Sequence, residues 1–179
     1  MRRGEIGGPV FTSVSEQISI HGRFRPNDIA LIEGDRKLSW AQYNDVANSL
    51  AARLRAQGVT RGDRIGLLFA NGLWAHEALL ATWRCGAAAV PLSPMLKAAQ
   101  LRVMVEDAGC IALLASPEYK QLACEASGTL PVFTASSLAA LAKSPEFIPF
   151  CPAREDLAVI IYSSGTTGLP KGIAHSHES

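Results

Sequence analysis

The sequence predicts an α/β fold, a layered α/β/α arrangement built around a largely parallel sheet. Its 179 residues are 48% hydrophobic and 18% charged, which is enough apolar material to bury a substantial core. The candidate strands are short, continuous apolar runs, as is typical of parallel strands buried on both faces. Helical patterns separate these runs along most of the chain, and this alternation favours helices on both sides of the sheet.

The clearest local signal is an amphipathic helix over residues 40–57. Ser39 and Gln42 have the spacing of a capping box, in which each side chain accepts a backbone N–H of the other residue. Apolar side chains then recur every three or four residues until Gly58, a residue type that often ends a helix.

The other elements follow from the same two periodicities. Gly34 with Asp35 indicates a turn after the first strand, and Gly109 indicates the end of a helix. The chain is predicted to form helices at residues 15–21, 40–57, 74–85, 96–107, 117–127 and 136–142, and strands at residues 29–33, 64–70, 87–92, 111–115, 131–134 and 156–162.

Proline placement indicates how the chain is divided. Pro145, Pro149 and Pro152 cluster between two predicted elements, which is typical of a linker. We therefore expect four parts: a loose N-terminus at 1–14, an α/β body at 15–142, a linker at 143–155, and at 156–179 a strand and loop that begin a further subdomain.

Charge, hydropathy and cysteine usage disfavour several classes of function. The net charge is +1 without runs of like charge, so nucleic acid is not an expected partner. No stretch reaches the roughly 18 uninterrupted apolar residues that a membrane span needs, and no signal peptide is recognisable, so we expect a cytoplasmic protein. The cysteines are widely spaced, and we expect reduced, mostly buried thiols at Cys85, Cys110, Cys124 and Cys151.

The segment that follows the last predicted strand carries the strongest chemical signal. Glycines let a backbone fold tightly and turn several N–H groups toward one point, hydroxyls add further donors, and a lysine adds positive charge. This combination suits a polyphosphate, although the same residue types also build plain surface turns. The candidate phosphate-binding residues are Ser163, Ser164, Gly165, Thr166, Thr167, Gly168 and Lys171.

Two common nucleotide-binding motifs do not fit this segment. A Walker loop needs Gly before its lysine and a hydroxyl after it, whereas Pro170 precedes Lys171 and Gly172 follows it. No G-x-G-x-x-G follows a strand, so a nicotinamide or flavin dinucleotide site has no support.

Residues 162–172, Tyr-Ser-Ser-Gly-Thr-Thr-Gly-Leu-Pro-Lys-Gly, closely resemble the signature loop of the adenylate-forming superfamily. The resemblance extends upstream through residues 38–43, 58–65 and 86–92. It implies the N-terminal part of a ligase large domain, with ATP, Mg²⁺ and coenzyme A as cofactors and a carboxylic acid as substrate. In the family this loop holds the β- and γ-phosphates. The resemblance therefore implies phosphate binding by the loop residues and a catalytic, charge-neutralising role for Lys171.

Histidines near the C-terminus offer a second candidate site. His175 and His177 form an H-x-H pair, but two histidines are too few ligands for a metal site, so we predict none. Many family members carry a Thr-His after the loop, with the His near the acyl pocket. Ser176-His177 is similar, and the resemblance therefore implies that His177 lies near the substrate.

The chain ends at Ser179, before the family's adenine, ribose and catalytic-lysine motifs. We therefore expect a fragment of an acyl-CoA synthetase that is inactive alone. The alternatives are a fragment of an amino-acid adenylation domain and a non-catalytic binding module that keeps the fold. Without the later segments, we expect the last strands, around Ile160, Ile161 and Ile173, to leave an unpaired edge and an exposed apolar face.

Overall fold

The computed structural model describes residues 11–134, 147–163 and 170–179. The predicted helix over residues 136–142 lies outside them. The helices are α1 Val14–Phe24, α2 Trp40–Ala56, α3 Leu73–Cys85, α4 Ala98–Asp107 and α5 Lys120–Ser127, and a 3-10 turn, η1, spans Pro117–Tyr119. The strands are β1 Ile29–Glu33, β2 Arg36–Ser39, β3 Arg64–Leu68, β4 Ala88–Leu92, β5 Ala112–Ala115, β6 Val132–Thr134, β7 Leu157–Ser163 and β8 Lys171–Ser176.

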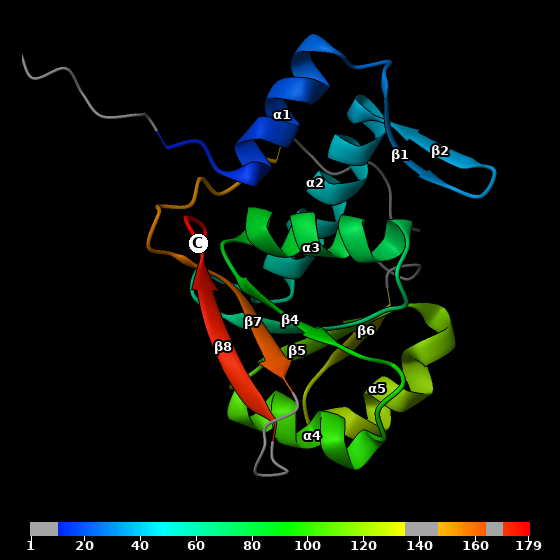
Figure 1. The fold of residues 1–179 in the computed structure, drawn as a ribbon, viewed down its shortest axis with the longest axis vertical. Coiled ribbons are helices and arrows are strands. Elements are labelled where there is room, and N and C mark those ends of the chain that lie inside the picture. Colours follow the sequence, from blue (N-terminus) through cyan, green and yellow to red (C-terminus); the bar gives the residue numbers. More distant parts are fainter. Residues whose placement is uncertain (1–10, 135–146, 164–169) are drawn as a thin grey trace, which may run out of the picture.

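The central sheet has six strands in the order β6-β5-β3-β4-β7-β8. All neighbouring pairs are parallel except the last, in which β8 runs antiparallel to β7. Helices α2 and α3 cover one face, and α4 and α5 cover the other (Figure 1). The prediction of a layered α/β/α fold with a largely parallel sheet is therefore confirmed.

Helix α2 begins and ends close to where the sequence indicates. The Ser39 hydroxyl accepts the Gln42 N–H at 3.3 Å, and the Gln42 side chain accepts the Ser39 N–H at 2.9 Å, so the capping box is formed. After Ala56 the chain passes through Gly58 at φ +90, a left-handed conformation that residues with a Cβ rarely adopt.

Two local features of the N-terminal region were not predicted. Strand β2 pairs antiparallel with β1 to form a hairpin, but its sequence, Arg-Lys-Leu-Ser, is short and mostly polar. Helix α1 starts with a second capping box, in which the Ser13 hydroxyl accepts the Glu16 N–H at 3.2 Å and the Glu16 carboxylate accepts the Ser13 N–H at 2.9 Å.

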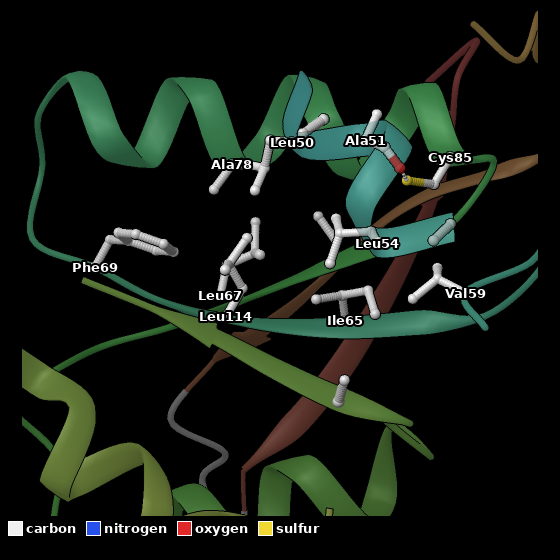
Figure 2. Close-up of a cluster of buried hydrophobic side chains, with 14 residues drawn as sticks. Leu50, Ala51, Leu54, Val59, Ile65, Leu67, Phe69, Ala78, Cys85 and Leu114 are labelled. Carbon is white, nitrogen blue, oxygen red and sulfur yellow. Dashed lines mark hydrogen bonds between the residues drawn. The ribbon is translucent and has the colours of Figure 1, made fainter. Parts of the chain in front are cut away.

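The main core lies between the sheet and helices α2 and α3 (Figure 2). Leu54 from α2, Ile65 from β3 and Leu114 from β5 meet there and are fully buried. Figure 2 also shows the Cys85 sulfur directed at the Ala51 carbonyl, at 3.2 Å. Burial of one such large apolar side chain contributes roughly 1.5–3 kcal/mol, so this layer holds the helices on the sheet.

A buried arginine joins the first three helices. Arg84 on α3 is fully buried, and its guanidinium donates to Asn44 and Asn48 on α2 and to Ser19 on α1. Burial lowers the pKa of Arg84 to about 10, so the side chain stays charged at neutral pH.

The expectation of an unpaired edge at the last strands is partly correct. Strand β7 is paired on both sides, with β4 and with β8, so its backbone is not left open. Strand β8 forms the outer edge of the sheet. Ile161 and Ile173 face each other across β7 and β8 and are 48% and 51% exposed, so an apolar pair does lie open to solvent.

The cysteines are free thiols, as expected, but only two are buried. Cys85 and Cys110 lie in the two cores, whereas Cys124 and Cys151 are exposed. The prediction of mostly buried thiols is therefore wrong for half of them. Among the residues that the structure describes, no helix is both long and apolar enough to cross a membrane.

Candidate functional site

The β7–β8 hairpin positions the candidate phosphate loop. Ser163 is the last residue of β7, Lys171 is the first of β8, and the two are cross-strand partners. Both residues are exposed. Because β7 is parallel to β4, Ser163 at the end of β7 and its partner Lys171 lie at the carboxyl edge of the sheet, where α/β proteins usually bind ligands. The structure thus places a hydroxyl-bearing and an ammonium-bearing residue side by side at that edge.

The rest of the predicted loop falls outside the described residues. These positions are Ser164, Gly165, Thr166, Thr167 and Gly168. Their phosphate-binding role stays a prediction, as does that of Ser163 and Lys171.

The side chain next to the loop is anchored to a helix. The Tyr162 hydroxyl donates to the Asp107 carboxylate at 2.5 Å, which joins the end of β7 to the end of α4. Burial, followed by this hydrogen bond, raises the pKa of Tyr162, so the phenol stays protonated. Tyr162 also packs against the core on the α4 side of the sheet.

His177 lies at the other end of the hairpin from Lys171. The loop joins Ser163 to Lys171, whereas β8 carries the chain back to a position beside Asp156, whose backbone oxygen accepts the His177 N–H at 3.0 Å. The His177 ring packs edge-on against Trp83 at 5.6 Å, and burial lowers its pKa. The structure therefore does not bring His177 together with Ser163 or Lys171, and its substrate role stays a prediction.

Two contacts fix this far end of the hairpin. The Trp83 indole N–H donates to the Ala158 carbonyl at 2.9 Å, and Arg61 pairs with Asp156 at 2.7 Å. The Arg61 hydrogen bond lowers the pKa of Asp156. Strand β7 is thus tied to the body of the domain at both ends.

A cavity of about 740 Å³ opens at the same carboxyl edge, where β3 and β4 end and α3 begins. Its apolar walls carry a few polar groups, which is typical of small-molecule sites. His76, which its sequence context did not single out as a site residue, lines it. The signal in the sequence that could have indicated this cavity is the position of Phe69 and Ser93, directly after the parallel strands β3 and β4. Lining residues include Leu67, Phe69, Asn71, His76, Ser93 and Tyr119.

Helix α3 also carries a buried ionisable group that was not singled out from the sequence. Glu77 on α3 is only 2% exposed, and burial raises its pKa to about 7, an effect that Arg36 partly offsets and Glu33 reinforces. Glu33 itself lies against Gly72 at the start of α3, and Arg36 lies over the Trp74 ring at 5.5 Å. The β1–β2 hairpin is therefore docked on the first turns of α3 by charged side chains.

Metal ligands are not concentrated anywhere in the described ranges. Among residues 11–134, 147–163 and 170–179, no three His, Cys, Asp or Glu side chains lie close enough together to hold a metal ion.

An α/β/α domain with a largely parallel sheet has an architecture whose members usually bind ligands at the carboxyl edge of the sheet. Residues 20–179 match the family model of AMP-binding enzymes, so the chain belongs to the AMP-binding family of adenylate-forming enzymes. This match confirms the resemblance seen in the sequence.

Comparison with single proteins agrees with this family. Tyrocidine synthase 2 of Brevibacillus parabrevis is 30% identical over 169 residues, which are 94% of this chain and 5% of that protein. Most of the curated relatives found are nonribosomal peptide synthetases or synthases of this kind. The chain spans only 2–9% of the length of these relatives.

Solved structures share the fold. VinN, in complex with 3-methylaspartate, has a TM-score of 0.80 and 27% identity, and the match covers 93% of this chain and 48% of VinN. The O-succinylbenzoate coenzyme A synthetase MenE of Bacillus subtilis, in complex with AMP, has a TM-score of 0.82 and 25% identity, and the match covers 92% of this chain and 42% of MenE. The chain corresponds to the N-terminal part of such enzymes.

Proposed function

We propose that this chain supplies the ATP-phosphate loop of an enzyme that joins a carboxylic acid to AMP and releases pyrophosphate. The observation that supports this most directly is the pairing of Ser163 with Lys171 at the carboxyl edge of the sheet, in a chain of the adenylate-forming family. A hydroxyl and an ammonium group are donors that phosphate oxygens accept, so the described residues fit a triphosphate.

Lys171 is the residue to which we assign the larger effect. Attack of a carboxylate on the α-phosphorus leaves developing negative charge on the departing pyrophosphate. An exposed ammonium at the start of β8 stabilises that charge, and the hydroxyl of Ser163 helps to hold the triphosphate in line. MgATP in the family supplies the activated phosphorus. The described residues offer no carboxylate cluster for Mg²⁺, so we assign none of them to that ion.

We propose an amino acid as the acid, because the curated relatives are mostly peptide synthetases. The sequence-based preference for an acyl-CoA synthetase has less support from these relatives. It stays the second candidate because MenE, a coenzyme A synthetase, shares the fold at 25% identity. If the enzyme is an acyl-CoA synthetase, coenzyme A accepts the acyl group. If it is a peptide synthetase, the acceptor is a thiol bound to a carrier.

The expectations about the subdomain division, His177 and the cellular location stay proposals. We propose that residues 156–179 begin a further subdomain after the 15–142 body, although β7 and β8 pair within the same sheet. A substrate contact for His177 would require a group at the far end of the hairpin. A cytoplasmic location is supported by the free thiols of Cys85 and Cys110.

The test is binding of MgATP to the purified chain by titration calorimetry. We expect saturable binding that Lys171→Ala weakens by roughly 10- to 100-fold, the scale of losing one charge-assisted contact. Lys120→Ala, which changes an exposed lysine at the start of α5, is the matched control and should bind like the wild type. A folded wild-type chain that does not bind MgATP, or a Lys171→Ala variant that binds equally well, would contradict the proposal.

A further inference from the structure

The Tyr162 side chain connects strand β7 to helix α4. It belongs to β7, packs on the α4 side of the sheet, and donates to Asp107, the last residue of α4, at 2.5 Å. The bond thus connects β7, the strand that leads into the predicted phosphate loop, to α4, a helix that covers one face of the sheet.

Gly172 lets the same ring reach the strand that leaves the loop. Tyr162 and Gly172 are cross-strand partners. A Cβ at position 172 would lie 3.1 Å from Cζ of Tyr162 and 3.1 Å from Cγ2 of Ile160, closer than side chains normally pack. The ring therefore occupies the space above the Gly172 backbone, and a larger residue there would displace it from Asp107.

Two side chains from the sheet donate hydrogen bonds at the C-terminal end of α4. The last turn of α4 contains no basic residue of its own, but the Arg64 guanidinium of β3 donates to the Ala108 and Gly109 carbonyls, at 3.0 and 2.8 Å, beside the exposed Asp107 carboxylate. The phenol of Tyr162 supplies a donor at this point.

We propose that Tyr162, held by Asp107 and seated over Gly172, is a positioning residue for Ser163 and Lys171, the two described ends of the predicted phosphate loop. Ser163 and Lys171 are the next residues on the two strands, so the anchored pair sets the direction in which both side chains point. The inference rests on the proposed function, because it concerns how the same loop meets the triphosphate. It adds Asp107 of α4 to a site that is otherwise defined by one segment.

The test compares variants that remove the bond with variants that keep it. Tyr162→Phe and Asp107→Ala should each weaken MgATP binding by roughly 10-fold, the scale of one hydrogen bond to a charged group. The double variant should bind no more weakly than either single one, because both remove the same bond. Asp107→Asn keeps an acceptor oxygen and should retain most of the affinity. Gly172→Ala should act like Tyr162→Phe.

Hydrogen exchange supplies a readout that needs no ligand. Amides of residues 160–163 and 171–174 should exchange faster in Tyr162→Phe than in the wild type. Tyr43→Phe is the matched control, because the Tyr43 hydroxyl also makes one hydrogen bond, to the His76 carbonyl at 3.1 Å. It should lower the melting temperature without changing MgATP affinity or exchange in the hairpin.

The outcomes separate this inference from the proposed function. Faster exchange in Tyr162→Phe, with no MgATP binding by the wild type, would support the anchor and contradict the proposed function. Normal binding by the wild type, with unchanged affinity and exchange in Tyr162→Phe, would overturn the positioning role. Equal loss of affinity in Tyr43→Phe and Tyr162→Phe would show a general effect of stability and overturn it as well.

Discussion

The guanidinium of Arg84 donates to both the backbone oxygen and the side-chain oxygen of Asn44, on the neighbouring helix. Asn44 in turn donates to the carbonyls of Ile18 and Trp40, so one amide connects α1, α2 and α3. Among the described contacts, the acceptors around this buried cation are neutral oxygens of Asn44, Asn48 and Ser19.

We expect Asn44→Ala to destabilise the domain by about 2–3 kcal/mol, because it removes a neutral acceptor from a buried charge. Urea unfolding followed by circular dichroism measures this loss. Asn27→Ala, at an exposed turn, is the control and should change stability little. Similar midpoints for Asn44→Ala and the wild type would show that water replaces the amide.

Glu77 should make stability depend on pH. Burial raises its folded-state pKa from 4.5 to about 7, so the folded state holds the proton more tightly than the unfolded state. Its contribution is fully present below about pH 4.5 and is lost as the pH rises through 7, a change on the order of 2–3 kcal/mol. Glu77→Gln removes this titration and should be more stable than the wild type at pH 8.

The measurement for Glu77 is the difference in unfolding free energy between variant and wild type from pH 4.5 to 8. Taking the difference cancels the other titrating groups. Glu118→Gln, at an exposed site in η1, is the control and should show a flat difference. A flat difference for Glu77→Gln would mean that its carboxyl titrates normally.

Lys171→Ala should slow catalysis when this chain is part of a complete adenylate-forming enzyme. In an enzyme completed with the later segments of a peptide synthetase, acid-dependent exchange of pyrophosphate into ATP should fall roughly 10- to 1,000-fold, the scale of losing one stabiliser of transition-state charge. Amino acids should support exchange better than fatty acids. Activity only with fatty acids and coenzyme A would favour the second candidate, and an unchanged rate would remove Lys171 from the site.

The thiols should differ in reactivity toward iodoacetamide. Cys124 is exposed and should react first. Cys151 is also exposed, but the hydrogen bond that it donates to Glu16 raises its pKa. Burial raises the pKa of Cys85 to about 12 and the pKa of Cys110 to about 11. Because the thiolate is the reactive form, Cys151 should react slowly, and the two buried thiols slowest of all.

Mass spectrometry of tryptic peptides measures these rates. Glu16→Gln removes the charge beside Cys151 and should speed its alkylation while leaving Cys124 unchanged. Equal rates at Cys124 and Cys151 in the wild type would contradict the predicted effect of Glu16.

Most of the fold could be predicted because its signals are local. Periodicity and the Ser39 capping box located α2, and continuous apolar runs located the strands from β3 to β7. Strand β2 was missed because half of its four residues are charged, and it is held by pairing with β1. The burial of Arg84 could not be predicted either, because the acceptors that permit it come from separate helices.

The candidate site was predictable in one segment and unpredictable in its surroundings. The residue types of the loop suggest phosphate binding without any tertiary information, and the structure adds that Ser163 and Lys171 face each other. The bond from Tyr162 to Asp107 joins residues far apart in sequence, and neither residue type singles it out. The same holds for the cavity lined by His76, whose walls come from separate strands and helices.

The order of the strands has a consequence for folding kinetics. Strands β7 and β8 are neighbours in sequence and form a hairpin, which needs only a short loop to close. The pairing of Val159 with Ala89 joins this hairpin to β4 across a long stretch of chain, and such distant contacts cost more entropy before they stabilise anything. The hairpin should therefore attach last, after strands β6, β5, β3 and β4 have assembled. During synthesis, the β6-β5-β3-β4 part of the sheet would form first. The backbone hydrogen-bonding groups on one edge of β4 would then stay unpaired until β7 and β8 are added.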